Sequence, residues 1–155
     1  MKTEVLNKQL SEDEIKRLSS HYLNEGRKQE AWQVDRISVK DDRLDADISM
    51  KSLYLSDTDG GGFHLTIFST LEFLSELVII YIHVWAGLED KTQEGWMVEC
   101  KARNVKAIRN PDAIKVEMHV ESIRRRGKTV RIVTDCRITD DQGGLFEVWL
   151  KGFLA

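Results

Sequence analysis

The stretch from residue 66 to residue 85 reads TIFSTLEFLSELVIIYIHVW and is the only long apolar run in the chain. At 100° per residue it has a single polar stripe on an otherwise apolar cylinder, formed by Ser69, Glu72, Glu76 and His83. Carboxylates are costly at the middle of a bilayer, so we expect a buried helix and no membrane span. A helix that is apolar on most sides must be covered on most sides, which a curved antiparallel sheet can do.

Strand patterns lie on both sides of this helix. Period-two alternation and turn signals predict strands at 31–39, 44–49, 95–109, 114–125, 128–139 and 145–154. In the fifth of these, Val130, Ile132, Thr134, Cys136 and Ile138 share one face. The order of a first helix, two strands, a glycine-rich loop, the long helix and four strands predicts the hotdog fold, an α+β architecture.

The first thirty residues should add an amino-terminal helix to a hotdog core at 31–155, and at 155 residues we expect one domain. Ser11 with Glu14 forms a capping box, and Gly26 is the expected end of this helix. The polar, acidic start does not resemble a signal peptide, which favours a cytosolic protein. Cys100 and Cys136 both lie in strand patterns, and we expect two small buried thiols.

Charge and composition argue against some classes of function. The net charge of −3 argues against a protein that wraps nucleic acid. The chain has neither a Cys-x-x-Cys motif nor clustered His and Cys residues, so we expect no metal site, and no pattern calls for a cofactor.

The carboxylates of the polar stripe have two interpretations. In one, the stripe faces solvent or a subunit interface, and Glu72 and Glu76 are hydrated. In the other, Glu72 lies at the mouth of an acyl channel, where partial desolvation would raise its pKa and suit it to act as a general base. Glu76, one turn further on, would then line the same channel.

The loop that leads into the long helix is the second candidate for chemistry. Residues 56–62 read SDTDGGG, and Phe63 and His64 follow directly. Glycines such as Gly61 and Gly62 allow a ligand to approach the backbone closely, and amides at a helix start can hold a developing oxyanion. His64 could polarise a carbonyl or act as a base, or it could be a helix-entry side chain without chemistry. Tyr54, just before the loop, could reach the same place or belong to the core.

Four cations occupy five positions at 124–128, where Arg124, Arg125 and Arg126 precede Gly127 and Lys128. The segment predicts a hairpin tip, and a solvated turn that keeps a sheet edge from pairing would explain the charge. The alternative is a docking point for the phosphates of coenzyme A or for the acidic surface of an acyl carrier protein. Arg103, Lys106 and Arg109 could extend this patch.

From about residue 46 onward the chain resembles hotdog enzymes that act on acyl thioesters, and among them the FcoT-like thioesterases. The resemblance rests on Tyr54, the glycine-then-histidine helix entry at Gly62 and His64, the long helix, and the DDQGG turn at 140–144 before the last strand. It implies hydrolysis of long-chain acyl-CoA or acyl-carrier-protein thioesters in fatty acid metabolism or lipid biosynthesis. It places Tyr54 and residues 64–66 beside the thioester. Thr66 stands where the family has asparagine, and its hydroxyl could orient water.

Two other readings remain open. The first is a 3-hydroxyacyl thioester dehydratase of the same fold, although the proline-rich segment usual before the helix in those enzymes is missing. The second is an acyl-thioester-binding protein without catalysis. Broader hotdog thioesterases have a helix carboxylate some nine residues after the histidine, and Glu72 follows His64 by eight. Hotdog domains generally pair through sheet edges, which predicts a homodimer or a dimer-based tetramer.

Overall fold

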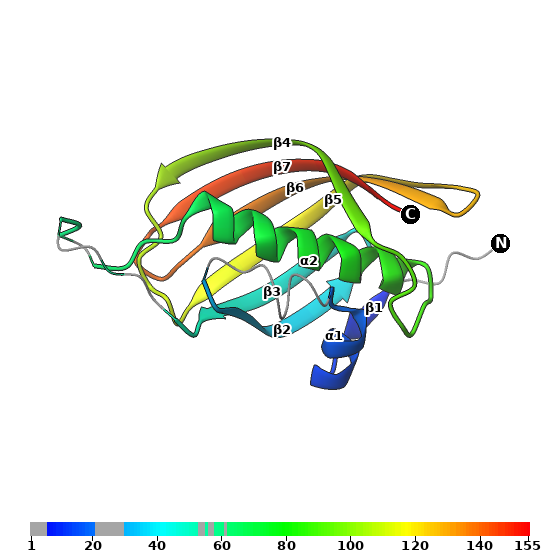
Figure 1. Cartoon of the computed structure of the whole chain (residues 1–155), viewed down its shortest axis with the longest axis horizontal. Helices are drawn as coiled ribbons and strands as arrows, with labels where there is room; N and C mark the ends of the chain where they lie inside the picture. The colour runs from blue at the N-terminus through cyan, green and yellow to red at the C-terminus, as the bar shows by residue number, and fades with distance from the viewer. Residues whose placement is uncertain (1–5, 21–29, 53–54, 56–57, 61) are drawn as a thin grey trace.

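The computed structural model of the chain describes residues 6–20, 30–52, 55, 58–60 and 62–155. Within these residues, seven strands form one antiparallel sheet in the order β1-β2-β3-β5-β6-β7-β4, and the sheet curves around the long helix α2 (Figure 1). The strands are β1 (Asn7–Gln9), β2 (Trp32–Lys40), β3 (Arg43–Met50), β4 (Gly95–Lys106), β5 (Ile114–Arg126), β6 (Thr129–Thr139) and β7 (Leu145–Leu154). The helices are α1 (Glu12–Leu18) and α2 (Ile67–Trp85). The predicted hotdog fold is confirmed.

The core lies between α2 and the concave face of the sheet. Phe73, Leu74 and Leu77 on α2 are fully buried, and Trp32 of β2 meets the Phe73 ring edge-on at 6.2 Å. By length and composition α2 could cross a membrane, but 67% of its most apolar window is buried within the described fold. The helix is apolar because protein surrounds it, as the sequence predicts.

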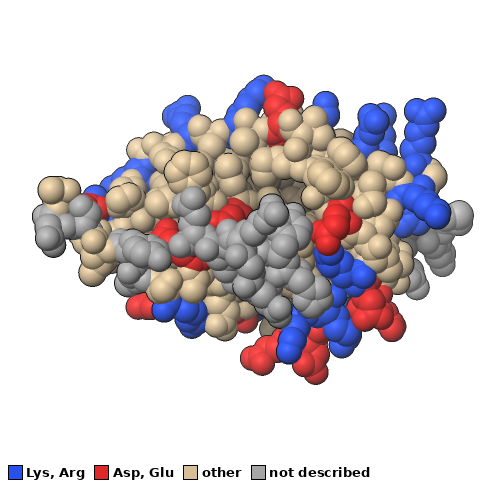
Figure 2. All heavy atoms as spheres, in the orientation of Figure 1, with Lys and Arg blue, Asp and Glu red and all other residues tan. Residues whose placement is uncertain are grey.

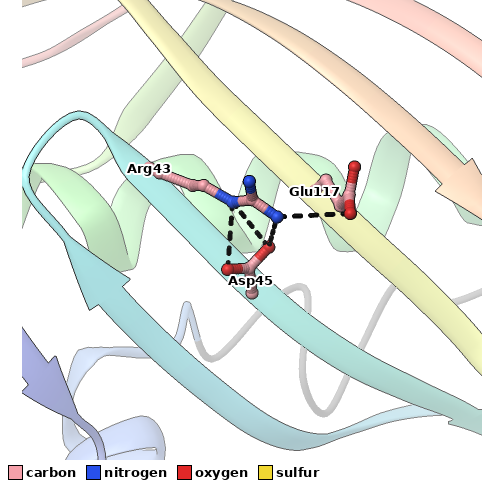
Figure 3. Close-up of polar contacts among 3 residues, drawn as sticks. All are labelled: Arg43, Asp45 and Glu117. Atoms are coloured by element: carbon pink, nitrogen blue, oxygen red, sulfur yellow. Dashed lines mark hydrogen bonds and ion pairs between the residues drawn. The ribbon is translucent and has the colours of Figure 1, made fainter.

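The convex face of the sheet is charged. Asp45 of β3 lies directly opposite Glu117 of β5, a like-charged pair that would be destabilising alone. Arg43 lies between them: its Nη2 is 2.9 Å from Asp45 Oδ1 and 3.2 Å from Glu117 Oε1 (Figure 3). Their neighbours Leu44 and Ala46 point to the core. This alternation specifies the register, because a one-residue slip would bury the charges.

Two expectations, about the end of the first helix and about Cys100, were wrong, and one short strand was not predicted. The capping box at Ser11 is present, but α1 ends at Leu18 instead of near Gly26, because the N–H of Ser19 and its hydroxyl both donate to the carbonyl of Ile15. Strand β1 has only three residues, all exposed, and carries too little pattern to be predicted. Cys100 is exposed on β4, whereas Cys136 is buried as expected.

The two edges of the sheet differ in length. The short strand β1 forms one edge, and the twelve residues of β4 form the other. After Gly95 every residue of β4 is exposed in the single chain, including the large apolar side chains Trp96, Val98 and Val105. A long exposed edge of this kind is a template for pairing with another strand.

Candidate functional site

The glycine-rich loop delivers the chain to the start of α2 through a tight turn. Gly62 has φ of 73°, a left-handed conformation that favours glycine, and its N–H donates to the carbonyl of Asp59 over 2.9 Å. The following Phe63 is buried, and its ring anchors the loop in the core. Thr66 is the N-cap, since its hydroxyl accepts from the N–H of Ser69 at 3.2 Å. The predicted role of Thr66 in orienting water remains a prediction, and the cap is the role that its hydroxyl has here.

His64 is held in place by a carboxylate. Its Nδ1 is 2.5 Å from Oδ2 of Asp59, and 52% of its side chain is exposed. The other oxygen of Asp59, Oδ1, accepts from Nη1 of Arg109 at 3.1 Å. The carboxylate itself is mostly covered, at 17% exposed. An imidazole with one nitrogen bound to a carboxylate and the ring open to solvent can exchange protons with a ligand through its other nitrogen.

Arg109 is anchored in turn by the loop between β6 and β7. Oδ2 of Asp140 accepts from the N–H of Arg109 at 2.7 Å and from the N–H of Asn110 at 3.0 Å, and Oδ1 accepts from Gln142 and Gly144. Partial burial alone would raise the pKa of Asp140, but the four backbone donors outweigh it and hold the pKa below its ordinary value. Strand β4 stops at Lys106 and does not reach the predicted residue 109, where the amides of Arg109 and Asn110 pair with the Asp140 side chain instead of a strand.

The polar stripe of α2 is largely covered and not hydrated. Ser69 and Glu76 are 0% and 1% exposed, and the hydroxyl of Ser69 donates to Oε1 of the buried Glu30 at 3.0 Å. The reading in which Glu76 faces solvent is therefore wrong, because Glu30, near the start of β2, and residues of α1 lie on this side of α2. Glu72 is half-buried, less than two turns from the start of the helix.

His83 belongs to the same stripe and has a structural role. Its Nδ1 lies 2.8 Å from the carbonyl of Ile79, and its Nε2 accepts from the N–H of Thr92 at 3.1 Å. Burial lowers the pKa of this imidazole and favours the neutral form that these two bonds require. Both ring nitrogens are thereby used.

Tyr54 and Gly61 lie outside the described residues, so their predicted roles stay predictions. Gly62, Phe63, His64 and Thr66 are brought together at the amino-terminal end of α2. Glu72 lies further along the same helix.

The arginine tip, Arg124 to Arg126, lies at the other end of the molecule. All three side chains are exposed on the β5–β6 hairpin, and the guanidinium of Arg125 lies 5.7 Å from the ring of Trp85, the last residue of α2. Figure 2 shows Lys and Arg side chains at the end where Figure 1 places this hairpin. The expectation that Arg109 extends this patch is wrong, because Arg109 binds Asp59 near the start of α2. Arg103 and Lys106 likewise lie on the later half of β4, which pairs with the start of β7 and not with the hairpin.

An apolar cavity of about 140 Å³ lies between the middle of α2 and strands β4, β6 and β7. Val78 and Ile79 line it from the helix, and Met97, Ile132 and Leu150 line it from the sheet. Gly95 helps to define its wall: a Cβ there would lie 2.6 Å from Cγ1 of Ile79. On the same side, α2 exposes Phe68, at 60%, beside the half-buried Leu71.

Three residues of the site were not predicted from the sequence: Asp59, Arg109 and Asp140. Asp59 lies in the SDTDGGG segment, five residues before His64, and an Asp so close to a histidine at a helix entry was the available signal. Arg109 is fifty residues away, and only the fold brings it to Asp59. Together the cluster offers a fixed imidazole beside the amino-terminal amides of α2. The N–H groups of the first helical residues have no acceptor within a helix. Because Thr66 takes the N–H of Ser69, those of Ile67 and Phe68 are the ones left to meet a developing negative charge.

Comparison with solved structures gives the same fold. A conserved protein of Pseudomonas aeruginosa matches with a TM-score of 0.56 at 11% identity, over 90% of this chain and 98% of the other. A protein of Streptococcus mutans bound to acetyl-CoA gives 0.52 at 10% identity, over 84% and 94%. A hypothetical thioesterase of Streptococcus pneumoniae with coenzyme A gives 0.50 at 12% identity, over 80% and 85%.

Searches against family models and against curated protein sequences found no match. The likeness to the solved structures described above shows that the chain is a hotdog protein, with a fold that thioesterase-like structures share. Its resemblance to the FcoT-like thioesterases in particular remains a prediction.

Proposed function

We propose that this protein hydrolyses acyl-CoA thioesters. The observation that carries the proposal is the half-exposed His64, fixed by Asp59 at the amino-terminal end of the core helix in a hotdog fold. Solved structures of this fold include a hypothetical thioesterase with coenzyme A and a protein bound to acetyl-CoA, which supports the same substrate class.

The proposed reaction adds water to the thioester carbonyl beside His64. The amides at the start of α2 would stabilise the oxyanion, and the positive end of the helix dipole would add to this effect. Within the part of the chain that the structure describes, His64 and Glu72 are two groups that can move a proton there, one half-exposed and one half-buried. For Tyr54 and Thr66 we propose the positions beside the thioester that the family resemblance implies.

We infer that the acyl chain lies along the exposed apolar side of α2. The cavity of about 140 Å³ beside Val78 and Ile79 would take its end. Since one water in the liquid occupies roughly 30 Å³, this cavity alone holds only a short apolar segment. A long chain would also cover Phe68 and Leu71, which a second subunit could enclose.

Release of free thiol from acyl-CoAs of increasing chain length, followed with a thiol-reactive dye, tests this function. We expect turnover of at least one chain length by the cytosolic enzyme without added metal or cofactor. A complete lack of thiol release at every length would contradict the proposal.

We further propose a homodimer joined through β4. Its eleven exposed edge residues, with Trp96, Val98 and Val105 among them, would pair with the same strand of a second copy. Light scattering should therefore give twice the chain mass at micromolar concentration. Val98→Glu together with Phe68→Glu should give a monomer, and Lys40→Glu, on β2 away from this edge, should not. A wild-type monomer would contradict the shared interface.

Such a dimer would also explain the arginine tip. Helix α2 is 19 residues, or about 28 Å, long, so His64 and the tip of one chain are roughly that far apart. An antiparallel β4 pair related by a two-fold axis would turn the tip of the second copy toward the His64 end of the first. We propose that phosphates of coenzyme A, or an acidic acyl carrier protein, dock on that tip.

Reversing the charge of Arg124, Arg125 and Arg126 to Glu should raise KM at least tenfold and leave kcat nearly unchanged, because the tip is remote from the reacting carbon. Steady-state kinetics at low and high salt measure this, and the wild-type KM should itself rise with salt. Lys115→Glu, on the same strand far from the tip, is the control. An unchanged KM in the triple variant would remove the tip from the site.

A further inference from the structure

We propose that Asp59 is a positioning residue that makes His64 the general base of the reaction. The inference rests on the proposed thioesterase and goes beyond it, because it assigns the base and the residues that prepare it. The choice of the base and the residues that prepare it both follow from the contacts of the Asp59 carboxylate.

The contact with Asp59 determines the tautomer of His64. An ionised carboxylate only accepts hydrogen bonds, so the 2.5 Å contact between Oδ2 of Asp59 and Nδ1 of His64 places the proton on Nδ1. Nε2 then carries the lone pair. With half of the side chain exposed, this lone pair is accessible to a water molecule or a ligand.

Arg109 holds Asp59 in place. Its Oδ1 accepts from Nη1 of Arg109 at 3.1 Å, and the same nitrogen lies 3.5 Å from the carbonyl of Phe63. Arg109 therefore joins Asp59 to the backbone just before His64. Because Asp140 binds the N–H of Arg109, the whole chain of contacts runs from the β6–β7 loop to the imidazole. A charge-assisted pair of this kind holds the carboxylate in place.

In the proposed reaction, His64 first accepts a proton and then donates it. Nε2 of His64 takes a proton from water as the water oxygen bonds to the thioester carbon, and the carbonyl pair moves onto oxygen. When the carbonyl reforms, the carbon–sulfur bond breaks and the electron pair leaves on sulfur. The sulfur takes the proton from Nε2, which gives the free acid and the free thiol and restores the neutral imidazole. Asp59 stabilises the imidazolium between these two transfers and does not itself react.

Glu72 fits this role less well. Glu72 is half-buried on the helix, whereas His64 is half-exposed and is held by Asp59 with its other ring nitrogen open to solvent. The contacts therefore favour His64 as the base, with Glu72 beside the substrate.

Asp59→Asn tests the proposal in the full-length protein. An amide at this position can donate to Nδ1 and so favours the wrong tautomer, and we expect kcat for acyl-CoA hydrolysis to fall by about a hundredfold or more with KM within a factor of about three. Asp59→Glu keeps the carboxylate and should recover activity to within about tenfold of wild type. Asp112→Asn, an exposed aspartate in the loop that follows Arg109, should retain full activity.

Ring-nitrogen NMR gives a readout that a merely structural role would not move. In ¹⁵N-labelled wild type at pH 8, His64, assigned by comparison with His64→Gln, should carry its proton on Nδ1, and in Asp59→Asn the proton should move to Nε2. A wild-type enzyme that hydrolyses acyl-CoA while Asp59→Asn stays within threefold of it would overturn the role of Asp59 and leave the thioesterase intact. Lack of thiol release by the wild type would overturn both, and a wild-type proton on Nε2 would overturn the positioning role whatever the activity.

Discussion

Replacing His64 by alanine should lower kcat for acyl-CoA hydrolysis by about 10²- to 10⁴-fold, the range that a positioned acid–base group contributes. The imidazole is the half-exposed titratable group at the start of α2, and Asp59 fixes it there. Because half of its side chain is in solvent, its loss should leave the fold intact. Thiol release and a thermal melt, measured on the same sample, separate the two effects.

Glu72→Gln is the matched comparison for this prediction. It keeps the shape of a half-buried side chain and replaces the carboxyl group by an amide, and we expect a loss of only about tenfold, since His64 is the base. Activity that collapses in Glu72→Gln and survives in His64→Ala would reverse the two roles. Equal activity of both variants and wild type would place the reaction elsewhere in the molecule.

Among the variants proposed here, Phe73→Ala should give the largest loss in free energy of unfolding. The ring is fully buried on α2 and meets the indole of Trp32 at 6.2 Å, so its removal leaves a cavity between the helix and the sheet. Such truncations cost about 3–5 kcal/mol in free energy of unfolding. Urea denaturation followed by tryptophan fluorescence measures it.

The control for this prediction is Leu55→Ala. Leu55 is 67% exposed, and its truncation should change the free energy of unfolding by less than about 0.5 kcal/mol. A loss at Phe73 as small as that at Leu55 would mean that α2 does not form the core. The two variants thus test the packing around α2 separately from its chemistry.

The elements predicted best are those with a local signal. The long helix was expected at 66–85 and runs from Ile67 to Trp85 with Thr66 as its N-cap, and β7 was expected at its observed bounds, Leu145–Leu154. In both, a single periodicity continues from a start signal to a stop signal. The end of α1 was mistaken because Ser19 caps the helix with its own hydroxyl, and nothing in the apolar spacing shows this.

The candidate site could be predicted only in part. His64 and its glycine-rich entry are contiguous, so the sequence alone drew attention to them. The contacts that define their chemistry join distant residues: Asp59 with Arg109 across fifty positions, and Ser69 with Glu30 across thirty-nine. The second of these contacts covers part of the polar stripe, for which helical spacing alone left both a solvent-facing and a channel-lining position open. Whether a polar residue on a helix is covered depends on segments that only the folded chain brings to it.

Product analysis with a 3-hydroxyacyl-CoA tests the central claim most directly, because an enzyme of either class can bind this substrate. Mass spectrometry after incubation with the wild-type protein should show free coenzyme A and the 3-hydroxy acid, with one oxygen from ¹⁸O-labelled water in the acid. Conversion to the 2-enoyl-CoA without release of coenzyme A would contradict hydrolysis and establish a dehydratase. Recovery of bound but unchanged substrate would contradict catalysis and establish a binding protein.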